Sequence, residues 1–157
     1  RRMAVEKRIV VGASGASGMP LLMKCLEILR DSEEYRSLLV MSRSAKLTLE
    51  QETDYTLEQL YALADEVHDN YNIGAGPASG SYRTMGMIVI PCSMKTLAGI
   101  VSGYSDNLVL RAADITLKER RKKISLPENG LSRYGNLSNN RCLCWQEYIM
   151  IIWKRNS

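Results

Sequence analysis

The sequence offers little that would suit a membrane or a nucleic acid. None of its apolar runs is long enough to cross a bilayer. The formal net charge of the 157-residue chain is only +4, and its basic residues are dispersed. The densest basic group, Lys118 with 120–123, falls at the predicted end of a helix, where the helix dipole favours cations. We therefore expect no membrane segment and no nucleic-acid partner.

Cysteine and histidine are scarce as well. Four cysteines, in a chain whose N-terminus does not resemble a secretory signal, predict free thiols and a cytoplasmic location. Cys142 and Cys144 have no second pair of ligands in the sequence, so we predict no metal site. The single histidine, His68, is interpreted as structural.

The strongest pattern is an apolar run at 8–12 that continues into glycine and serine residues up to Gly18. It predicts a strand, a loop of small residues and then a helix, whose positive N-terminal dipole would favour a phosphate at the loop. The spacing of Gly12, Gly15 and Gly18 matches neither the dinucleotide motif nor the nucleotide-triphosphate motif. The alternative is a tight turn without a ligand.

A second predicted strand, at 86–90, ends in a polar loop that contains Ser93, Lys95 and Thr96. Ligands of open α/β sheets bind where the carboxyl ends of parallel strands meet. Two hydroxyls and a cation suit an anionic group at that edge. The alternative is an ordinary helix N-cap beside a solvated lysine.

Strands and helices alternate along the chain. Strands are predicted near 8–12, 37–42, 86–90 and 122–126, helices near 19–31, 44–52, 57–64, 96–102 and 107–120, and a loop at 74–84. This alternation predicts a three-layer α/β/α fold, doubly wound around a mostly parallel sheet, of the Rossmann-like or flavodoxin-like type.

Several short motifs occur in a characteristic order, at 12–18, 39–42, 52–54, 78–81, 91–97, 110–114 and 117–121. In this order they resemble the UbiX-like flavin prenyltransferases, formerly called phenylacrylic acid decarboxylases. The resemblance covers about residues 7–123. It implies transfer of a dimethylallyl group from dimethylallyl monophosphate to reduced FMN, without a metal. The product, prenylated FMN, would serve UbiD-like decarboxylases. The resemblance also implies a homo-oligomer, commonly a dodecamer, with active sites between subunits.

The resemblance also implies roles for individual residues. The expected FMN contacts are Gly15, Ala16, Ser17, Ser42, Ser93, Met94, Lys95, Thr96 and Arg111. Ser17 and Glu52 would handle a proton near the flavin N5, and Lys118 would face the substrate phosphate. From the residues alone, Glu52 could equally be a solvated acid at a helix end, and Lys118 an exposed lysine. Arg111 stands in an otherwise apolar segment, where a cation requires a partner.

The resemblance ends after residue 123. In the family the next strand ends in Pro-Arg-Glu, whereas here Pro127 is followed by Glu128 and Asn129, so an asparagine stands at the position of a catalytic glutamate. We predict an FMN-binding flavoprotein domain over 1–126 and a divergent tail over 127–157, disordered or encoded in a shifted reading frame. The alternatives to a prenyltransferase are a non-catalytic FMN-binding protein and a related flavoprotein decarboxylase.

Overall fold

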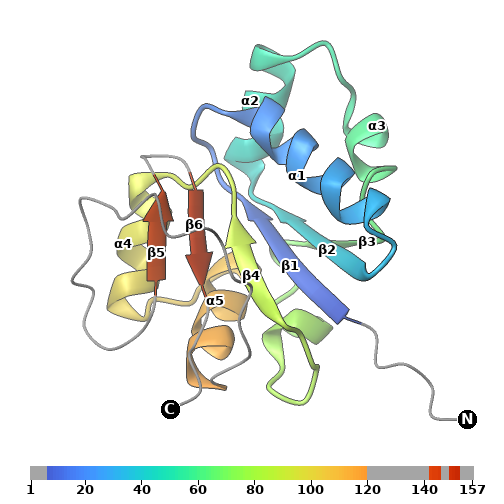
Figure 1. Ribbon diagram of the computed structural model, residues 1–157. Helices are drawn as coiled ribbons and strands as arrows, with labels where there is room; N and C mark the ends of the chain where they lie inside the picture. The colour runs from blue at the N-terminus through green and yellow to red at the C-terminus, as the bar shows by residue number, and fades with distance from the viewer. Residues whose placement is uncertain (1–6, 120–141, 146–148, 153–157) are drawn as a thin grey trace, which may run out of the picture.

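A computed structural model describes residues 7–119, 142–145 and 149–152. Strands and helices alternate through most of this length, as the sequence predicts (Figure 1). In chain order the elements are β1 (Lys7–Ala13), α1 (Met19–Asp31), β2 (Tyr35–Met41), α2 (Arg43–Glu52), α3 (Leu57–Tyr61), β3 (Glu66–Asp69), η1 (Gly76–Ala78), β4 (Gly86–Val89), α4 (Met94–Ser102), α5 (Leu108–Lys118), β5 (Cys142–Trp145) and β6 (Ile149–Ile152).

The strands form one six-stranded sheet in the order β3-β2-β1-β4-β6-β5. The first four run parallel to one another, whereas β6 pairs antiparallel with β4, and β5 pairs antiparallel with β6. The chain builds the sheet outward from β1 through β2 to β3, and then crosses to β4 on the other side of β1. The direction of winding therefore reverses between β1 and β4, which is where open α/β sheets bind ligands.

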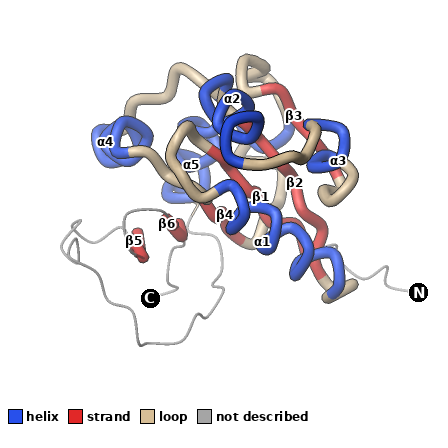
Figure 2. Tube along the Cα trace, turned by 90° about the horizontal axis from the view of Figure 1, so that it is seen from above, coloured by secondary structure: helices blue, strands red, loops and turns tan. Residues whose placement is uncertain are grey.

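Helices cover both faces of the sheet. Side chains alternate along β1, so Ile9 and Val11 pack with α1, α2 and α3, whereas Val10 packs with α4 and α5. Seen from above, the strands run between α1 and α5 (Figure 2). The three-layer α/β/α fold with a mostly parallel sheet is therefore confirmed.

Local sequence explains where helices begin and end. Pro20 stands in the first turn of α1, where a missing amide hydrogen costs no helical hydrogen bond. The buried residues Leu22, Leu26 and Leu29 then recur at helical spacing. Gly103 ends α4 with a φ of 73°, a left-handed conformation that glycine adopts without steric cost.

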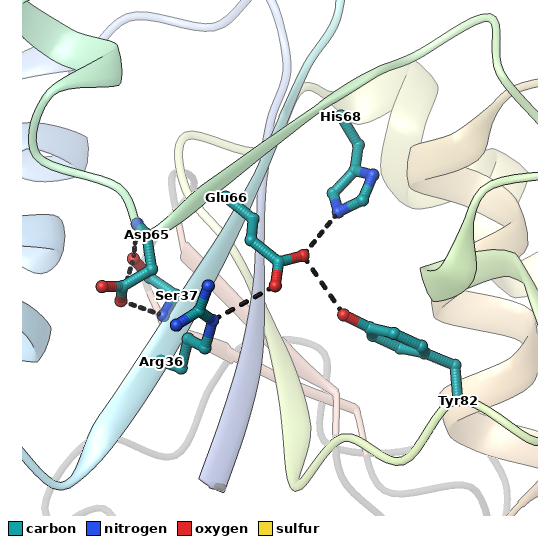
Figure 3. A network of polar contacts seen from close by, with 6 residues as sticks. All are labelled: Arg36, Ser37, Asp65, Glu66, His68 and Tyr82. Atoms are coloured by element: carbon teal, nitrogen blue, oxygen red, sulfur yellow. Dashed lines mark hydrogen bonds and ion pairs between the residues drawn. The ribbon is translucent and has the colours of Figure 1, made fainter.

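The edge strand β3 was not predicted from the sequence. Glu66, at its start, accepts hydrogen bonds from Arg36 Nε at 3.1 Å and from the Tyr82 hydroxyl at 3.2 Å, and its carboxylate lies 3.1 Å from His68 Nε2 (Figure 3). This network ties the edge of the sheet to the loop after η1. His68 takes part in this network through Glu66, which agrees with its interpretation as a structural residue.

The predicted strand near 122–126 and the boundary at 126 lie outside the described residues. β5 and β6 belong to the segment predicted as a divergent tail, and their backbones continue the sheet beyond β4. Within the described ranges, no helix combines the length and the apolar character that a membrane crossing requires.

Candidate functional site

The loops that follow β1 and β4 are joined by one buried serine. Ser14 donates its amide to the Pro91 carbonyl at 3.0 Å and its hydroxyl to the same carbonyl at 2.9 Å. The Ser14 hydroxyl also accepts the Ser93 amide at 2.6 Å. Ser14 is only 3% exposed, so these bonds are largely shielded from water. The two loops that the sequence predicts to share a ligand are therefore held side by side.

The helices α1, α2 and α4 begin at this edge of the sheet. α2 begins after Ser42, whose hydroxyl accepts the Ala45 amide at 3.1 Å. α4 begins after Ser93, whose hydroxyl accepts the Thr96 amide at 3.2 Å. α1 begins after Gly18, which has no side chain with which to cap the helix. Helix N-termini carry partial positive charge, so the edge as a whole favours an anion.

Glu52, the last residue of α2, caps the N-terminus of α1. Its Oε2 accepts the Met19 and Gly18 amides, each at 3.0 Å. The Met19 amide is the main cause that lowers the pKa of the Glu52 carboxyl; slight burial opposes it, and the Gly18 amide and Ser17 hydroxyl lower the pKa further. Glu52 is therefore an exposed, ionised carboxylate at neutral pH. It occupies the N-terminus of α1, where the sequence predicts a phosphate. Glu52 also contacts Ser17, the residue with which it is expected to handle a proton.

The loop between β1 and α1 presents unused backbone donors. The amides of Gly15, Ala16 and Ser17 donate no hydrogen bond to any residue that the structure describes. Gly15 lies against the start of α2, where an added Cβ would be 2.4 Å from the Cβ of Ser44. Glycine is therefore required at position 15 for the loop to lie this close to α2. The three successive amides at 15–17 remain available to a ligand.

Arg111 stands near the start of α5, and this start of the helix lies against the end of β1. Val109, two residues before it in α5, packs against Gly12 near the end of β1, where an added Cβ would lie 3.3 Å from Val109 Cγ1. The Nε of Arg111 is buried and has no hydrogen-bond partner among the described residues. A buried nitrogen without a partner is costly. The partner that the sequence leads us to expect for Arg111 is therefore not supplied by this part of the protein.

The remaining predicted residues are more exposed. Met94 is 57% exposed, Lys95 is exposed, and Thr96 is half-buried, with its hydroxyl 3.1 Å from the Ser93 hydroxyl that donates to it. All of them lie at the start of α4, beside the loop after β4.

Lys118 lies at the far end of α5. Its Nζ pairs with Asp114 Oδ2 at 2.7 Å, one turn earlier in the same helix. At about 1.5 Å per residue, the nine steps from Val109 to Lys118 correspond to roughly 14 Å along the helix axis. The structure therefore does not bring Lys118 to Ser17 and Glu52 within one copy of the chain.

Two features of the site were not predicted. Ser14 lies within a motif that was recognised, but its role as the tie between the loops depends on a partner far along the chain. The capping role of Glu52 had a signal in the sequence, because Gly18 offers no cap and the first turn of α1 has no acidic residue. Within 7–119, no group of three or more His, Cys, Asp and Glu side chains is placed so that it could hold a metal ion.

Comparisons with known proteins identify the family. Residues 1–141 match the family model described as Flavoprotein. The chain is 51% identical over 115 residues to the flavin prenyltransferase UbiX of Escherichia coli strain K12, covering 73% of this chain and 61% of that protein. It is 44% identical over 133 residues to the flavin prenyltransferase UbiX of Neisseria meningitidis serogroup B, covering 85% and 70%. The chain belongs to the flavoprotein family, among its UbiX-like flavin prenyltransferases.

Solved structures agree with this placement. The crystal structure of AnUbiX in complex with FMN and dimethylallyl pyrophosphate matches with a TM-score of 0.72 at 50% identity, covering 74% of this chain and 62% of that one. A dodecameric FMN-dependent UbiX-like decarboxylase from Escherichia coli O157:H7 matches with a TM-score of 0.72 at 53% identity, covering 73% and 63%. The chain spans less than two thirds of the Escherichia coli K12 relative and of both solved chains.

Proposed function

We propose that this chain binds FMN at the carboxyl ends of β1 and β4 and transfers a dimethylallyl group from dimethylallyl monophosphate to reduced FMN. The observation that carries the proposal is the pair of hydrogen bonds through Ser14, which holds two donor-rich loops together. The chain that contains them is 51% identical over 115 residues to a flavin prenyltransferase. The product, prenylated FMN, would be delivered to UbiD-like decarboxylases.

The chemistry of the described residues fits FMN. The flavin mononucleotide carries a phosphate dianion and several hydrogen-bond acceptors on its ring and ribityl chain. The loop amides at 15–17 and the Nε of Arg111 are donors without a protein partner among the described residues. Ser42 and residues 93–96 add hydroxyls, the cation of Lys95 and two helix N-termini. These are the residues that would hold the cofactor.

The proposed chemistry divides between the cofactor and the side chains. When bound, reduced FMN supplies an electron-rich ring that accepts the dimethylallyl group as the carbon–oxygen bond to the phosphate breaks. Glu52 is ionised at neutral pH and can accept a proton, and the Ser17 hydroxyl hydrogen-bonded to it can relay that proton. Because Lys118 lies far from these residues, it would act on the phosphate at a site formed with a neighbouring subunit.

The test combines binding with product analysis. We expect the chain to bind FMN and not NAD in equilibrium dialysis. Anaerobic incubation with reduced FMN and dimethylallyl monophosphate, or with the pyrophosphate in a parallel sample, should give prenylated FMN by mass analysis of the extracted flavin. Tight NAD binding without FMN binding would overturn the proposal.

A second candidate is a non-catalytic FMN-binding protein or a related flavoprotein decarboxylase. It is favoured by Asn129, which stands where the resemblance places a catalytic glutamate. Loss of one acid-base group typically lowers a rate by about two to four decades, so we expect slow formation of prenylated FMN. FMN binding with no product at all, beside a full-length relative that forms it, would select this second candidate.

We further propose an FMN-binding unit over 1–126 that assembles as a homo-oligomer, supported by the dodecameric relative. Light scattering tests the assembly, and a clean monomer that binds FMN fully would show that the site does not need its neighbours.

We place the chain in the cytoplasm, because Cys25 and Cys92 are both free thiols.

A further inference from the structure

The helix that follows the glycine-rich loop has no cap of its own. Gly18 occupies the N-cap position with a φ of 116°, and the first turn of α1 contains no acidic residue. Pro20 has no amide hydrogen, and the Leu21 amide donates to the Gly18 carbonyl at 2.9 Å. The Gly18 and Met19 amides donate to the carboxylate of Glu52. The donors at the start of α1 are therefore already used within the protein.

Glu52 also connects the loop to α2. The Ser17 hydroxyl hydrogen-bonds to its carboxylate, while Gly15 lies against Ser44 at the other end of the same helix. The loop therefore contacts both ends of α2. Gly15 packs against the start of this helix, and Ser17 contacts Glu52, its last residue. Between these two contacts lie the amides that no described residue accepts.

We propose that Glu52 is a positioning residue for the cofactor site: its carboxylate caps α1 in place of the side chain that Gly18 lacks, fixes the loop at 14–18, and closes the N-terminus of α1 to phosphate. The inference rests on the proposed binding of FMN and adds to the proton transfer proposed for Glu52. Two anionic groups cannot share the same pair of amides, because like charges repel at contact distance. The phosphate of FMN is therefore directed away from α1 while Glu52 is ionised.

The inference predicts that a small carboxylate can replace the side chain. Glu52→Ala should bind FMN about tenfold more weakly, the size of effect expected from losing a helix cap. Because Glu52 is exposed, formate at about 100 mM can enter the vacated position and should restore most of the affinity, whereas chloride at equal ionic strength should not. Glu50→Ala, which removes an exposed acid from the same helix, is the matched control and should stay within about twofold of the parent with either salt.

A second measurement is independent of FMN. In amide NMR spectra, inorganic phosphate should shift the Gly18 and Met19 signals of Glu52→Ala and leave those of the parent chain unchanged. Should Glu52→Ala not fold, Glu52→Gln retains an acceptor oxygen without the charge, and its affinity for FMN should lie below that of the parent.

The outcomes separate the two proposals. A parent chain that does not bind FMN overturns the proposed function, while the NMR experiment still tests the cap. If the parent binds FMN and Glu52→Ala binds it equally, or if formate restores nothing, Glu52 is not a positioning residue. Equal FMN affinity in the parent and in Glu52→Gln would overturn the inference in the same way.

Discussion

Replacing Ser14 with alanine should loosen the connection between the two loops of the site. The substitution removes the hydrogen bond to the Pro91 carbonyl and leaves the Ser93 amide without its acceptor. A polar group left unsatisfied in the interior costs roughly 1–3 kcal/mol. The Pro91 carbonyl keeps the Ser14 amide as a donor, and Ser93 is only half-buried. We therefore expect the free energy of unfolding to fall by about 2 kcal/mol.

The assay is urea unfolding of the parent chain and of two variants. Ser32→Ala is the control, because the Ser32 hydroxyl makes a single bond, to the Leu29 carbonyl at 2.7 Å, at the exposed end of α1. It should cost less than about 0.5 kcal/mol. In FMN titrations Ser14→Ala should bind about tenfold more weakly and Ser32→Ala normally. If Ser14→Ala is no less stable than Ser32→Ala, the tie contributes nothing, and unchanged FMN affinity would show that the two loops do not share a ligand.

Three further predictions follow from the geometry. Gly15→Ala should weaken FMN binding by more than about tenfold, because its Cβ has no room against α2, whereas Gly74→Ala, at an open position, should bind FMN normally. Arg111→Ala should weaken FMN binding more than Lys24→Ala, which removes an exposed cation, and equal losses would argue against Arg111 as a contact. Burial raises the pKa of Glu66, but hydrogen bonds from its three partners lower it below its ordinary value of 4.5. Glu66→Gln should therefore cost about 1 kcal/mol at neutral pH, a difference that shrinks in urea unfolding as the pH falls below 4.5 through the lowered pKa.

The fold could be predicted where one face of an element is buried. Residues 8–12 and 19–31 have uninterrupted apolar or helical patterns, and the structure places β1 and α1 there. The strand β3 has only four residues and lies at the edge of the sheet, with alternating half-buried and exposed side chains and a single β-branched residue, Val67. Its pairing with β2 is decided by tertiary contacts that a local pattern does not contain.

The strands β5 and β6 were not predicted either, for a different reason. Ile149–Ile152 is a short apolar run, which is typical of a strand, and it pairs with β4 in the structure. The sequence predicts a divergent tail over 127–157, because the motifs of this segment do not match those of the family. A motif comparison reports which residues are shared, whereas strand pairing depends on apolar character and backbone geometry, which unrelated sequences can also provide.

The direction of the Glu52 pKa shift decides which proton role this residue can take, and residue type alone could not give it. A solvated carboxyl at a helix end and a capping carboxylate look the same in the sequence, because the amides of Gly18 and Met19 come from a helix that begins more than thirty residues earlier. Those amides favour the charged form, so in the proposed reaction Glu52 would accept a proton at neutral pH and would not donate one. Proton uptake removes the charge that the α1 amides stabilise, so the cap weakens while the proton is held and strengthens again when it leaves. Under the proposed function, proton transfer at Glu52 would therefore be coupled to the order of the loop at 14–18.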